Sequence, residues 1–408
     1  MVLTDINREP VCVMAYSHDG FGLGHLRRNT NIAARLVQDV PDSNALLVVG
    51  CPRGAFFESP PGVDFIKIPS IVKVDTGVHQ PLNLRIDLGK IKALRASTIL
   101  NVAEIYQPHL FLVDHVPTGV WAELLPTLQM LRERENPPQI VFGMRDIIDT
   151  PEVVREQWKR QDIYKAIRTY YDEVLIYGCR SVFDAASEYG LNDELSGRVS
   201  YSGYVCSGEP YKTRDQMREQ LRLGREKLVV VTAGGGRDAH SMLRTCVDAF
   251  RLLVKDVLFE AILIAGPLMP PEEKESLERQ ARGLNVRVLS QVFENLNYVN
   301  AADLVISMAG YNSLVEILQL RKKSIVIPRL GPSAEQVMRA RLFEQRGLID
   351  VIYPRELSPK RLADRMLRDF DCSDYPVYDK TIELDGAANA AAHLTQLLGK
   401  QVYGTAAD

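Results

Sequence analysis

Residues 303–316 read DLVISMAGYNSLVE, and this stretch decides the fold of the chain. The apolar run Leu304 to Ile306 suits a buried parallel strand, because such strands are covered on both faces. Ala309-Gly310 then provides a tight turn at which a backbone can approach a ligand closely. Asn312 or Ser313 can cap the helix that follows. A strand, a glycine turn and a helix in this order predict a βαβ unit whose helix N-terminus can bind an anion.

Two further signals follow in the same segment. Glu316 lies one turn inside the predicted helix, where its carboxylate can accept two hydrogen bonds from a sugar diol. A second predicted strand, Ser324 to Pro328, is followed by Glu335-Gln336. The alternative is an ordinary βαβ unit with a capped helix and a solvated Glu316, and the residues alone leave both interpretations open.

The segment resembles the donor-binding half of the GT-B nucleotide-sugar glycosyltransferases. The resemblance runs from about Val229 to Ile352 and is closest to glycosyltransferase family 28, which includes the enzyme that adds N-acetylglucosamine to lipid I. It implies a diphosphate held at Ala309, Gly310, Asn312 and Ser313. It also implies that Glu316 binds the ribose, that Glu335 and Gln336 face the donor sugar, and that Phe293 lies beside the base.

Composition sets limits on the class of protein. The chain has 408 residues, which is enough for two domains. Of these residues 46% are hydrophobic and 25% are charged, as is average for globular proteins. A net charge of −3 does not favour nucleic acid as a partner. Residues 1–10 are polar and no apolar run has the length of a membrane helix, so we expect a cytoplasmic protein without an integral membrane segment. The six cysteines are scattered, which disfavours a zinc site and a disulfide framework.

Strands and helices alternate along the chain, which predicts parallel α/β sheets. In the first half we expect strands at residues 11–16, 45–49, 65–68, 110–113, 139–142 and 173–176, and helices at 26–36, 88–106, 121–133 and 152–171. A polar, charged stretch at 207–227 separates the halves. The pattern then restarts with strands at 228–232, 259–264 and 286–289 and helices at 242–253 and 272–282.

These elements predict two Rossmann-like parallel α/β domains, and the resemblance implies the GT-B arrangement, in which they face each other across a cleft. We expect residues 1–205 to form an N-terminal, acceptor-side domain and residues 206–386 a C-terminal nucleotide-sugar donor domain. The resemblance implies that a C-terminal helix within residues 387–408 packs back on the N-terminal domain.

A second glycine-rich loop follows the first predicted strand and contains Gly22, Gly24 and His25. A dinucleotide-binding interpretation would require an acidic residue after the second strand, and none is there. The form Gly-x-Gly-His-x-x-Arg instead resembles the first loop of several nucleotide-sugar enzymes, including nucleotide-sugar hydrolases. His25 begins a helix, whose positive end favours a neutral imidazole that can act as general base. The alternative is a histidine that only braces the loop. Of Arg27 and Arg28, which point to different helix faces, one could reach a phosphate while the other is solvated.

Other candidates lie at predicted strand ends. Gly235 and Gly236, with Arg237, expose backbone N–H groups that suit a diphosphate, and a plain flexible loop is the alternative. Asp114 could assist the base. His115, Arg145 and Asp146 are candidates for the acceptor side, although an Asp–Arg ion pair that braces the loops is equally compatible with these positions.

Together these features predict an inverting glycosyltransferase that uses a nucleotide diphosphate sugar, such as a UDP-sugar, as donor and the hydroxyl or amine of a small molecule as acceptor. The sequence has no clear Asp-x-Asp metal motif, so we expect no metal and no cofactor besides the donor substrate. A nucleotide-sugar hydrolase, a sugar epimerase and a non-catalytic nucleotide-sugar-binding protein are the alternatives. The residues carry no signal for the acceptor or for the oligomeric state.

Overall fold

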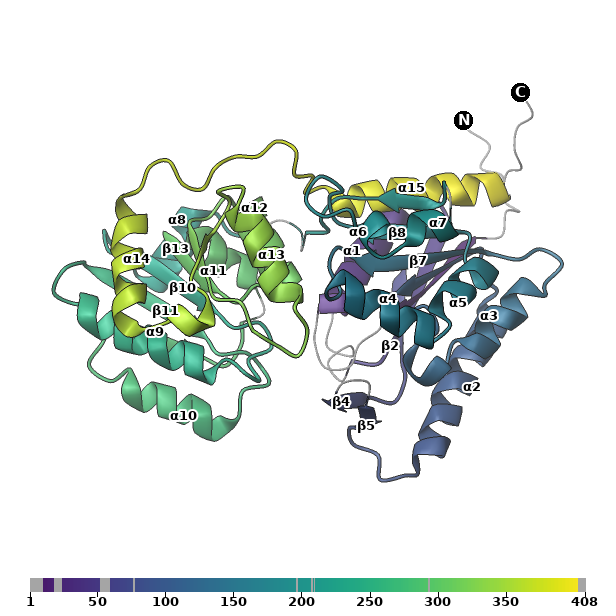
Figure 1. Cartoon of the computed structure of the whole chain (residues 1–408), viewed down its shortest axis with the longest axis horizontal. Helices are drawn as coiled ribbons and strands as arrows, with labels where there is room; N and C mark the ends of the chain where they lie inside the picture. The colour runs from purple at the N-terminus through teal and green to yellow at the C-terminus, as the bar shows by residue number, and fades with distance from the viewer. Residues whose placement is uncertain are drawn as a thin grey trace. The chain divides into compact units, whose positions relative to one another are not determined.

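The computed structural model describes residues 10–17, 24–51, 59–75, 78–195, 197–206, 208, 210–292 and 294–402. The chain forms two compact units (Figure 1). Unit 1 consists of Met1–Asp146, Pro151–Val205 and Asp385–Asp408, and unit 2 consists of Ile147–Thr150 and Cys206–Leu384. Each unit is built around its own parallel sheet.

Unit 1 contains a seven-stranded sheet in the order β3-β2-β1-β6-β7-β8-β9 over its described residues. All neighbouring strands run parallel, and β6 and β8 are buried along their whole length, as expected for strands covered on both faces. The strands are β1 (Val11–Ser17), β2 (Ser43–Val49), β3 (Val63–Lys67), β6 (Leu110–Asp114), β7 (Gln139–Arg145), β8 (Glu173–Tyr177) and β9 (Val199–Tyr201). A separate antiparallel hairpin joins β4 (Ile71–Asp75) to β5 (Val78–Pro81).

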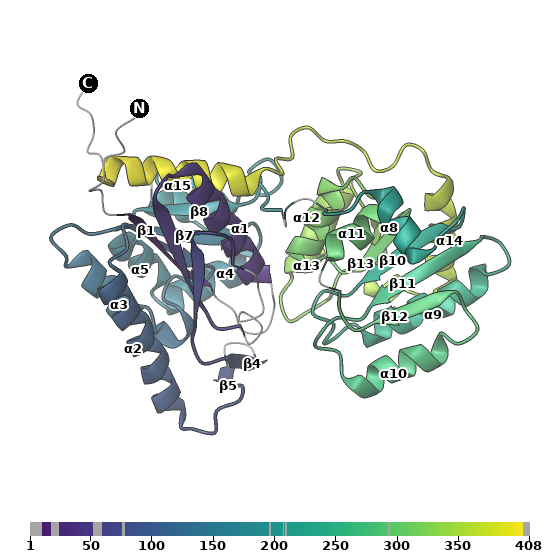
Figure 2. The ribbon, with the colours of Figure 1, turned by 180° about the vertical axis from the view of Figure 1, so that it is seen from behind.

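The helices of unit 1 connect these strands and cover the sheet. They are α1 (Gly24–Asp39), α2 (Leu88–Tyr106), η2 (Val120–Ala122), α3 (Leu125–Arg132), α4 (Pro151–Arg160), α5 (Ile163–Tyr170), α6 (Ala185–Glu188), α7 (Leu191–Glu194) and α15 (Gly386–Val402). The last of these, α15, lies along α1, as both views show (Figures 1 and 2). Small buried side chains at Ala390 and Ala391 allow this close approach. A Cβ at Gly386 would lie 2.5 Å from the Tyr204 backbone, so glycine is required where α15 begins.

Unit 2 contains a six-stranded parallel sheet in the order β12-β11-β10-β13-β14-β15 over its described residues. Its strands are β10 (Lys227–Thr232), β11 (Phe259–Ile264), β12 (Val286–Leu289), β13 (Leu304–Ser307), β14 (Ser324–Val326) and β15 (Asp350–Val351). Its helices are α8 (Arg214–Leu221), α9 (His240–Leu253), α10 (Pro271–Gln280), α11 (Asn295–Ala301), α12 (Tyr311–Gln319), α13 (Glu335–Glu344), η3 (Pro354–Glu356) and α14 (Pro359–Asp371). A continuous core joins α9 and α14 to alternate residues of β10, such as Val229 and Val231.

Two predicted helices of unit 1 are wrong in extent. The helix expected at 121–133 is broken, because Trp121 and Ala122 have positive φ (55° and 63°) and α3 begins only at Leu125. The helix expected at 152–171 ends at Arg160, because Asp162 takes a left-handed conformation with φ 53° and α5 starts after it. The periodicity of the sequence does not predict these breaks, since none of the three residues with positive φ is a glycine.

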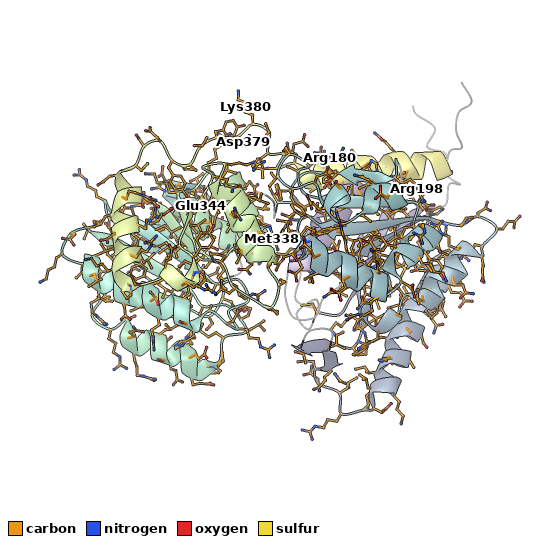
Figure 3. The ribbon with its side chains drawn as sticks, in the orientation of Figure 1. Arg180, Arg198, Met338, Glu344, Asp379 and Lys380 are labelled. Carbon is orange, nitrogen blue, oxygen red and sulfur yellow. The ribbon has the colours of Figure 1, made fainter. Side chains whose placement is uncertain are left out.

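The charged stretch expected as a boundary also contains a helix. Thr213 and Gln216 form a capping box that starts α8, in which the Thr213 side chain accepts from the Gln216 amide and the Gln216 side chain accepts from the Thr213 amide. Side-chain hydrogen bonds also fix loops in unit 1, where Arg198, labelled in Figure 3, donates to the Tyr171 carbonyl. The donor and acceptor lie 3.2 Å apart. No helix within the described residues has the length and apolar character needed to cross a membrane.

The strand orders indicate which loops of each sheet are positioned to bind a ligand. Each sheet runs outward in both directions from its first strand, so the connections reverse between β1 and β6 in unit 1 and between β10 and β13 in unit 2. In open α/β sheets, ligands bind at the carboxyl ends of the strands at such a reversal. The topology therefore identifies one candidate edge in each unit.

Candidate functional site

The edge of unit 1 brings His25 and Asp114 together. His25 is the second residue of α1, which follows β1, and Asp114 is the last residue of β6. His25 Nδ1 lies 2.5 Å from Asp114 Oδ2, and the imidazole is 18% exposed whereas the carboxylate is fully buried. A carboxylate at Nδ1 favours the tautomer with its proton on Nδ1, which leaves the Nε2 lone pair available to take a proton.

Arg28, one turn further along α1, completes this cluster. Its Nη2 donates to Asp114 Oδ1 at 2.6 Å, and the side chain is 2% exposed. Burial would raise the pKa of Asp114, but Arg28 and then His25 outweigh burial and hold that pKa well below its usual range. Asp114 is therefore a permanent anion beneath the imidazole.

The pKa of His25 is lowered from its ordinary value. The main cause is burial of the ring, and the charges of Arg28 and Arg145 act in the same direction, while Asp114 opposes them. The imidazole is consequently neutral at neutral pH, as a general base must be.

The loop after β6 is strained at several positions beside this pair. His115, Trp121 and Ala122 all have positive φ, between 55° and 69°, although none is a glycine. Glu123 anchors the end of the loop, accepting from the Tyr16 hydroxyl and from Arg95 Nε, each at 2.6 Å. Backbone strain that the surrounding structure imposes is typical of functional loops.

The remaining unit 1 candidates lie around the same edge. The rings of His115 and His25 have centroids 5.0 Å apart. Arg145 ends β7 and is half-buried, and Asp146 follows it and is buried. Gly24 is the first residue of α1, whereas Gly22 lies outside the described residues.

In unit 2 the loop after β10 is shaped by its glycines. Gly234 and Gly236 have positive φ, and Gly235 and Arg237 are exposed. A Cβ at Gly236 would lie 2.0 Å from the Ala265 carbonyl oxygen, and the Leu268 amide donates to the Gly235 carbonyl at 2.9 Å. The loop is therefore held against the neighbouring loop that follows β11, which contradicts the alternative of a plain flexible loop.

The turn after β13 behaves differently. Gly310 has an ordinary φ of −65°, and a Cβ there would meet no atom of the described residues within 4 Å. Neither its φ nor packing among the described residues requires glycine, and the open backbone leaves room for a ligand to approach.

Gly310 is also the N-cap of α12, without a side-chain cap bond. The expectation that Asn312 or Ser313 caps this helix is wrong, because the helix begins at Tyr311 and both residues already lie in its first turn. Ala309, just before the cap, is fully buried, and its carbonyl accepts from Arg339 Nη1 at 3.2 Å.

Glu316 is buried rather than solvated, with 3% exposure. Its Oε2 accepts from Asn295 Nδ2 at 2.7 Å, so the carboxylate is oriented from the start of α11. Phe293, expected beside the base, lies outside the described residues.

Glu335 and Gln336 begin α13 and are both 7% exposed. Gln336 Oε1 accepts from the Arg329 amide at 3.0 Å, and Glu335 Oε2 lies 3.7 Å from Arg339 Nη2. The Ala334 amide at the N-cap donates to Asp149 Oδ1 at 3.0 Å. The pair is thus held in place at a helix N-terminus, where the helix dipole favours an anion.

Sequence reasoning missed four residues that organise these edges: Arg28 as the partner of Asp114, Asn295, Asp149 and Arg339. Each acts through a contact far along the chain, such as the 86 residues between Arg28 and Asp114. The i to i+3 spacing of His25 and Arg28 and the i to i+4 spacing of Glu335 and Arg339 could have suggested two of them.

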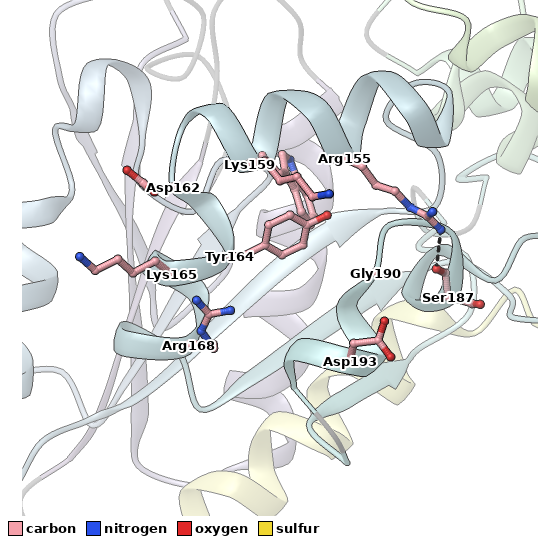
Figure 4. A pocket seen from close by; sticks show the side chains of 10 residues that line it. Arg155, Lys159, Asp162, Tyr164, Lys165, Arg168, Ser187, Gly190 and Asp193 are labelled. Atoms are coloured by element: carbon pink, nitrogen blue, oxygen red, sulfur yellow. Dashed lines mark hydrogen bonds between the residues drawn. The ribbon is translucent and has the colours of Figure 1, made fainter.

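A hollow of about 490 Å³ lies elsewhere in unit 1, among α4, α5 and α7 (Figure 4). Arg155, Lys159, Lys165 and Arg168 line it together with Tyr164, and it contains none of the candidate residues. Across the described residues, no group of three His, Cys, Asp or Glu side chains is arranged to hold a metal ion.

Comparison with known proteins identifies the second half of the chain. Residues 228–394 match the glycosyltransferase family 28 C-terminal domain, as the sequence predicted for this part of the chain. An uncharacterized glycosyltransferase of Methanopyrus kandleri is 30% identical over 181 residues, which are 44% of this chain and 49% of that protein. The UDP-N-acetylglucosamine–N-acetylmuramyl-(pentapeptide) pyrophosphoryl-undecaprenol N-acetylglucosamine transferase of Caldanaerobacter subterraneus is 29% identical over 171 residues, 40% of this chain and 46% of that enzyme. The chain spans about half the length of these curated relatives.

Solved structures share the fold of the whole chain at low identity. The calicheamicin glycosyltransferase CalG4 has a TM-score of 0.62 and 13% identity, with 98% of this chain and 100% of that chain covered. MurG of Acinetobacter baumannii has a TM-score of 0.54 and 14% identity, with 96% and 100% covered. A putative UDP-N-acetylglucosamine 2-epimerase of Listeria monocytogenes has a TM-score of 0.66 and 12% identity, with 97% of each chain covered. The predicted GT-B fold class, with two Rossmann-like parallel α/β domains, is confirmed.

Proposed function

We propose that this chain transfers a sugar from a nucleotide diphosphate sugar, a UDP-sugar, to a hydroxyl or amine of a small molecule, with inversion and without a metal ion. The observation that carries the proposal is the His25–Asp114 pair at the strand-order reversal of unit 1. A neutral imidazole held by a buried carboxylate is a general base, and base catalysis is what an acceptor hydroxyl needs to become a nucleophile.

The proposed step moves one proton and exchanges one bond. His25 Nε2 takes the proton of the acceptor hydroxyl as its oxygen attacks the anomeric carbon of the donor sugar. The bond from that carbon to the diphosphate oxygen breaks, and the nucleoside diphosphate leaves with the bonding electrons. Asp114 stabilises the imidazolium that forms, because its carboxylate is already ionised and in contact with Nδ1.

Unit 2 supplies the donor site in this proposal. The amides of the Gly235 and Gly236 loop and the N-terminus of α12 at Gly310 would bind the diphosphate and stabilise its charge as it leaves. Glu316 would accept from the ribose hydroxyls, and Glu335 and Gln336 would bind the hydroxyls of the sugar. Buried, oriented carboxylates suit diol recognition because both oxygens can accept.

A nucleotide-release assay tests the function. The purified chain is incubated with UDP-sugars, alone and with a panel of hydroxyl and amine acceptors, and UDP is measured together with the product sugar linkage. The proposal expects UDP release that depends on an acceptor and produces an inverted glycosidic bond. A chain that releases no nucleoside diphosphate from any nucleotide sugar under these conditions would refute it.

A nucleotide-sugar hydrolase is the second candidate, because the same His25–Asp114 pair could deprotonate water. The assay separates the two. Acceptor-independent release of free sugar at a rate unaffected by any acceptor would assign the chain as a hydrolase, whereas release of a 2-epimer of the sugar would assign it as an epimerase.

A further inference from the structure

Arg28 contacts both members of the His25–Asp114 pair. Its Nη2 lies 2.6 Å from Asp114 Oδ1 and 2.9 Å from His25 Nδ1. His25 Nδ1 is thus within hydrogen-bond distance of an acceptor, at 2.5 Å, and of a donor. Because the contact with Asp114 is the shorter one, we assign the His25 Nδ1–H group as a donor to the Asp114 carboxylate. The Arg28 charge then lies beside this N–H group without a hydrogen bond to it.

The position of Arg28 is fixed from below by neighbouring strands. The guanidinium lies 5.0 Å from the centroid of the Tyr177 ring, at the end of β8. Tyr177 needs room at Gly143 in β7, where a Cβ would lie 2.0 Å from its hydroxyl oxygen. Gly143 is in turn the register partner of Asp114 in β6. The absence of a side chain at Gly143 therefore leaves room for the Tyr177 ring. This ring contacts the Arg28 guanidinium, which pairs with Asp114.

Among the described residues, the charged and titratable groups around His25 come from α1, β7, and β6 with the residue that follows it. Asp114 ends β6, His115 follows it, Arg145 ends β7 and Arg28 lies on α1. A histidine paired only with a carboxylate becomes more basic and protonates more readily. Burial of the ring is the main cause of the lowered pKa of His25, and Arg28 acts in the same direction by repulsion while it pairs with the Asp114 carboxylate.

We propose that Arg28 is a positioning residue that keeps His25 unprotonated at neutral pH while Asp114 orients it, so that the pair is a base ready for use. The proposal rests on the proposed function of His25, and it adds a role for the arginine of the Gly-x-Gly-His-x-x-Arg loop. Arg28 itself would touch neither donor nor acceptor.

The direct test is an NMR titration of the His25 ring in the full chain, with isotope-labelled histidine and the His25→Asn variant for assignment. Arg28→Gln removes the charge and should raise the midpoint of the His25 titration. Arg28→Lys keeps the charge and should leave the midpoint near that of the wild type. Equal midpoints in wild type and Arg28→Gln, or an equal rise in both variants, would overturn the proposal, because a merely structural role predicts no dependence on charge.

Arg28→Gln leaves the buried Asp114 charge without this partner and can fail to fold. The double variant Arg28→Gln with Asp114→Asn removes both charges at once and keeps the shape of the cluster. Where the Arg28→Gln single variant folds, the His25 midpoint of the double variant should lie below that of the single variant, which keeps the Asp114 charge. The Nδ1 proton of the double variant should also lose the protection from exchange that the hydrogen bond to Asp114 gives it. A midpoint in the double variant equal to or above that of imidazole in an unfolded peptide, about 6.5, would contradict a site that disfavours protonation.

Turnover gives the second readout. In Arg28→Gln the acid limb of kcat/KM should move to higher pH, and each rise of one pH unit in the midpoint of His25 should lower the rate on that limb about tenfold. The titration does not depend on turnover. A His25 midpoint that responds as expected in a chain without glycosyl transfer would refute the proposed function alone, whereas an unresponsive midpoint would refute the role of Arg28 alone.

Discussion

The two candidate edges lie on the same kind of parallel sheet but are built from different groups. In unit 1 the edge is made of ionised side chains, with Asp114 and Arg28 buried and in direct contact below His25. In unit 2 it is made mainly of backbone, with a glycine loop after β10 and the N-termini of α12 and α13. A buried charge cluster can set the basicity of one atom, whereas helix ends and amides bind an anion without transferring a proton. This difference supports our proposal that unit 1 transfers the proton and unit 2 binds the diphosphate.

The largest expected effect comes from a variant of the unit 1 edge that leaves the unit 2 edge unchanged. His25→Asn should lower kcat by roughly 10²–10⁴-fold, because asparagine can keep one hydrogen bond to Asp114 but cannot take a proton at neutral pH. The dissociation constant for UDP should stay within experimental error of the wild type, as measured by calorimetry. Steady-state rates of nucleotide release give kcat.

The matched control for that variant is His109→Asn, because His109 precedes β6, at the end of the strand opposite Asp114, and its Nδ1 accepts from the Cys12 amide at 3.1 Å. It should retain most of the turnover. If His109→Asn loses as much activity as His25→Asn, the loss in His25→Asn does not report removal of the base.

The next effect breaks the second edge. Glu316→Gln keeps the size of the side chain but removes its charge, and should weaken UDP binding by on the order of 1.5–3 kcal/mol. Glu344→Gln on α13 is the matched control (Glu344 is labelled in Figure 3). Among the described residues, its side chain accepts from the Tyr353 hydroxyl at 2.9 Å. Calorimetric titration of both variants should separate them, and equal affinities would show that Glu316 serves the fold alone.

A pair of glycine variants sharpens the difference between fold and ligand within unit 2. Gly236→Ala meets a carbonyl oxygen at 2.0 Å and has φ 85°, so it should lower the thermal stability of the chain, by roughly 1–3 kcal/mol for the backbone strain alone. Gly310→Ala meets no atom of the described residues within 4 Å and should cost less than about 1 kcal/mol of stability. It should nevertheless weaken UDP binding about tenfold if the diphosphate approaches this backbone. Thermal melting and calorimetry provide the two readouts, and intact UDP binding in a stable Gly310→Ala protein would rule out that approach.

The smallest effect is the pH dependence of stability. The pKa of His25 is lowered in the folded chain, so the unfolded chain binds its proton first and stability falls as the pH drops below about 6.5. The pKa of Asp114 is also lowered, so its contribution is complete above about pH 4 and is lost below that as the pH approaches the folded pKa. Denaturant unfolding of wild type and His25→Asn between pH 7 and pH 5 should show a steeper decline in the wild type. Parallel curves would mean that His25 titrates alike in both states.

The sequence predicted the edges better than the contacts that organise them. Strand ends and glycine turns are local features, so both α/β sheets, α2 over Leu88–Tyr106 and the βαβ unit at Leu304 were readable from pattern alone. The partner of Asp114 was not, because Arg28 precedes it by 86 residues and only the fold brings the two together. Two predicted helices are interrupted by positive φ at Trp121 and Asp162, and because neither residue is a glycine, the sequence did not indicate the breaks. The roles of Gly236 and Gly310 also look alike in the sequence, and only the surrounding atoms distinguish them.

The central claim is that the base and the diphosphate site lie on different edges, and one calorimetric series tests it most directly. UDP is titrated into wild type, His25→Asn and Gly310→Ala under the same conditions. The account predicts equal affinity in wild type and His25→Asn and weaker binding in Gly310→Ala. Binding that is lost in His25→Asn and intact in Gly310→Ala, or absent from the wild type at millimolar nucleotide, would contradict it.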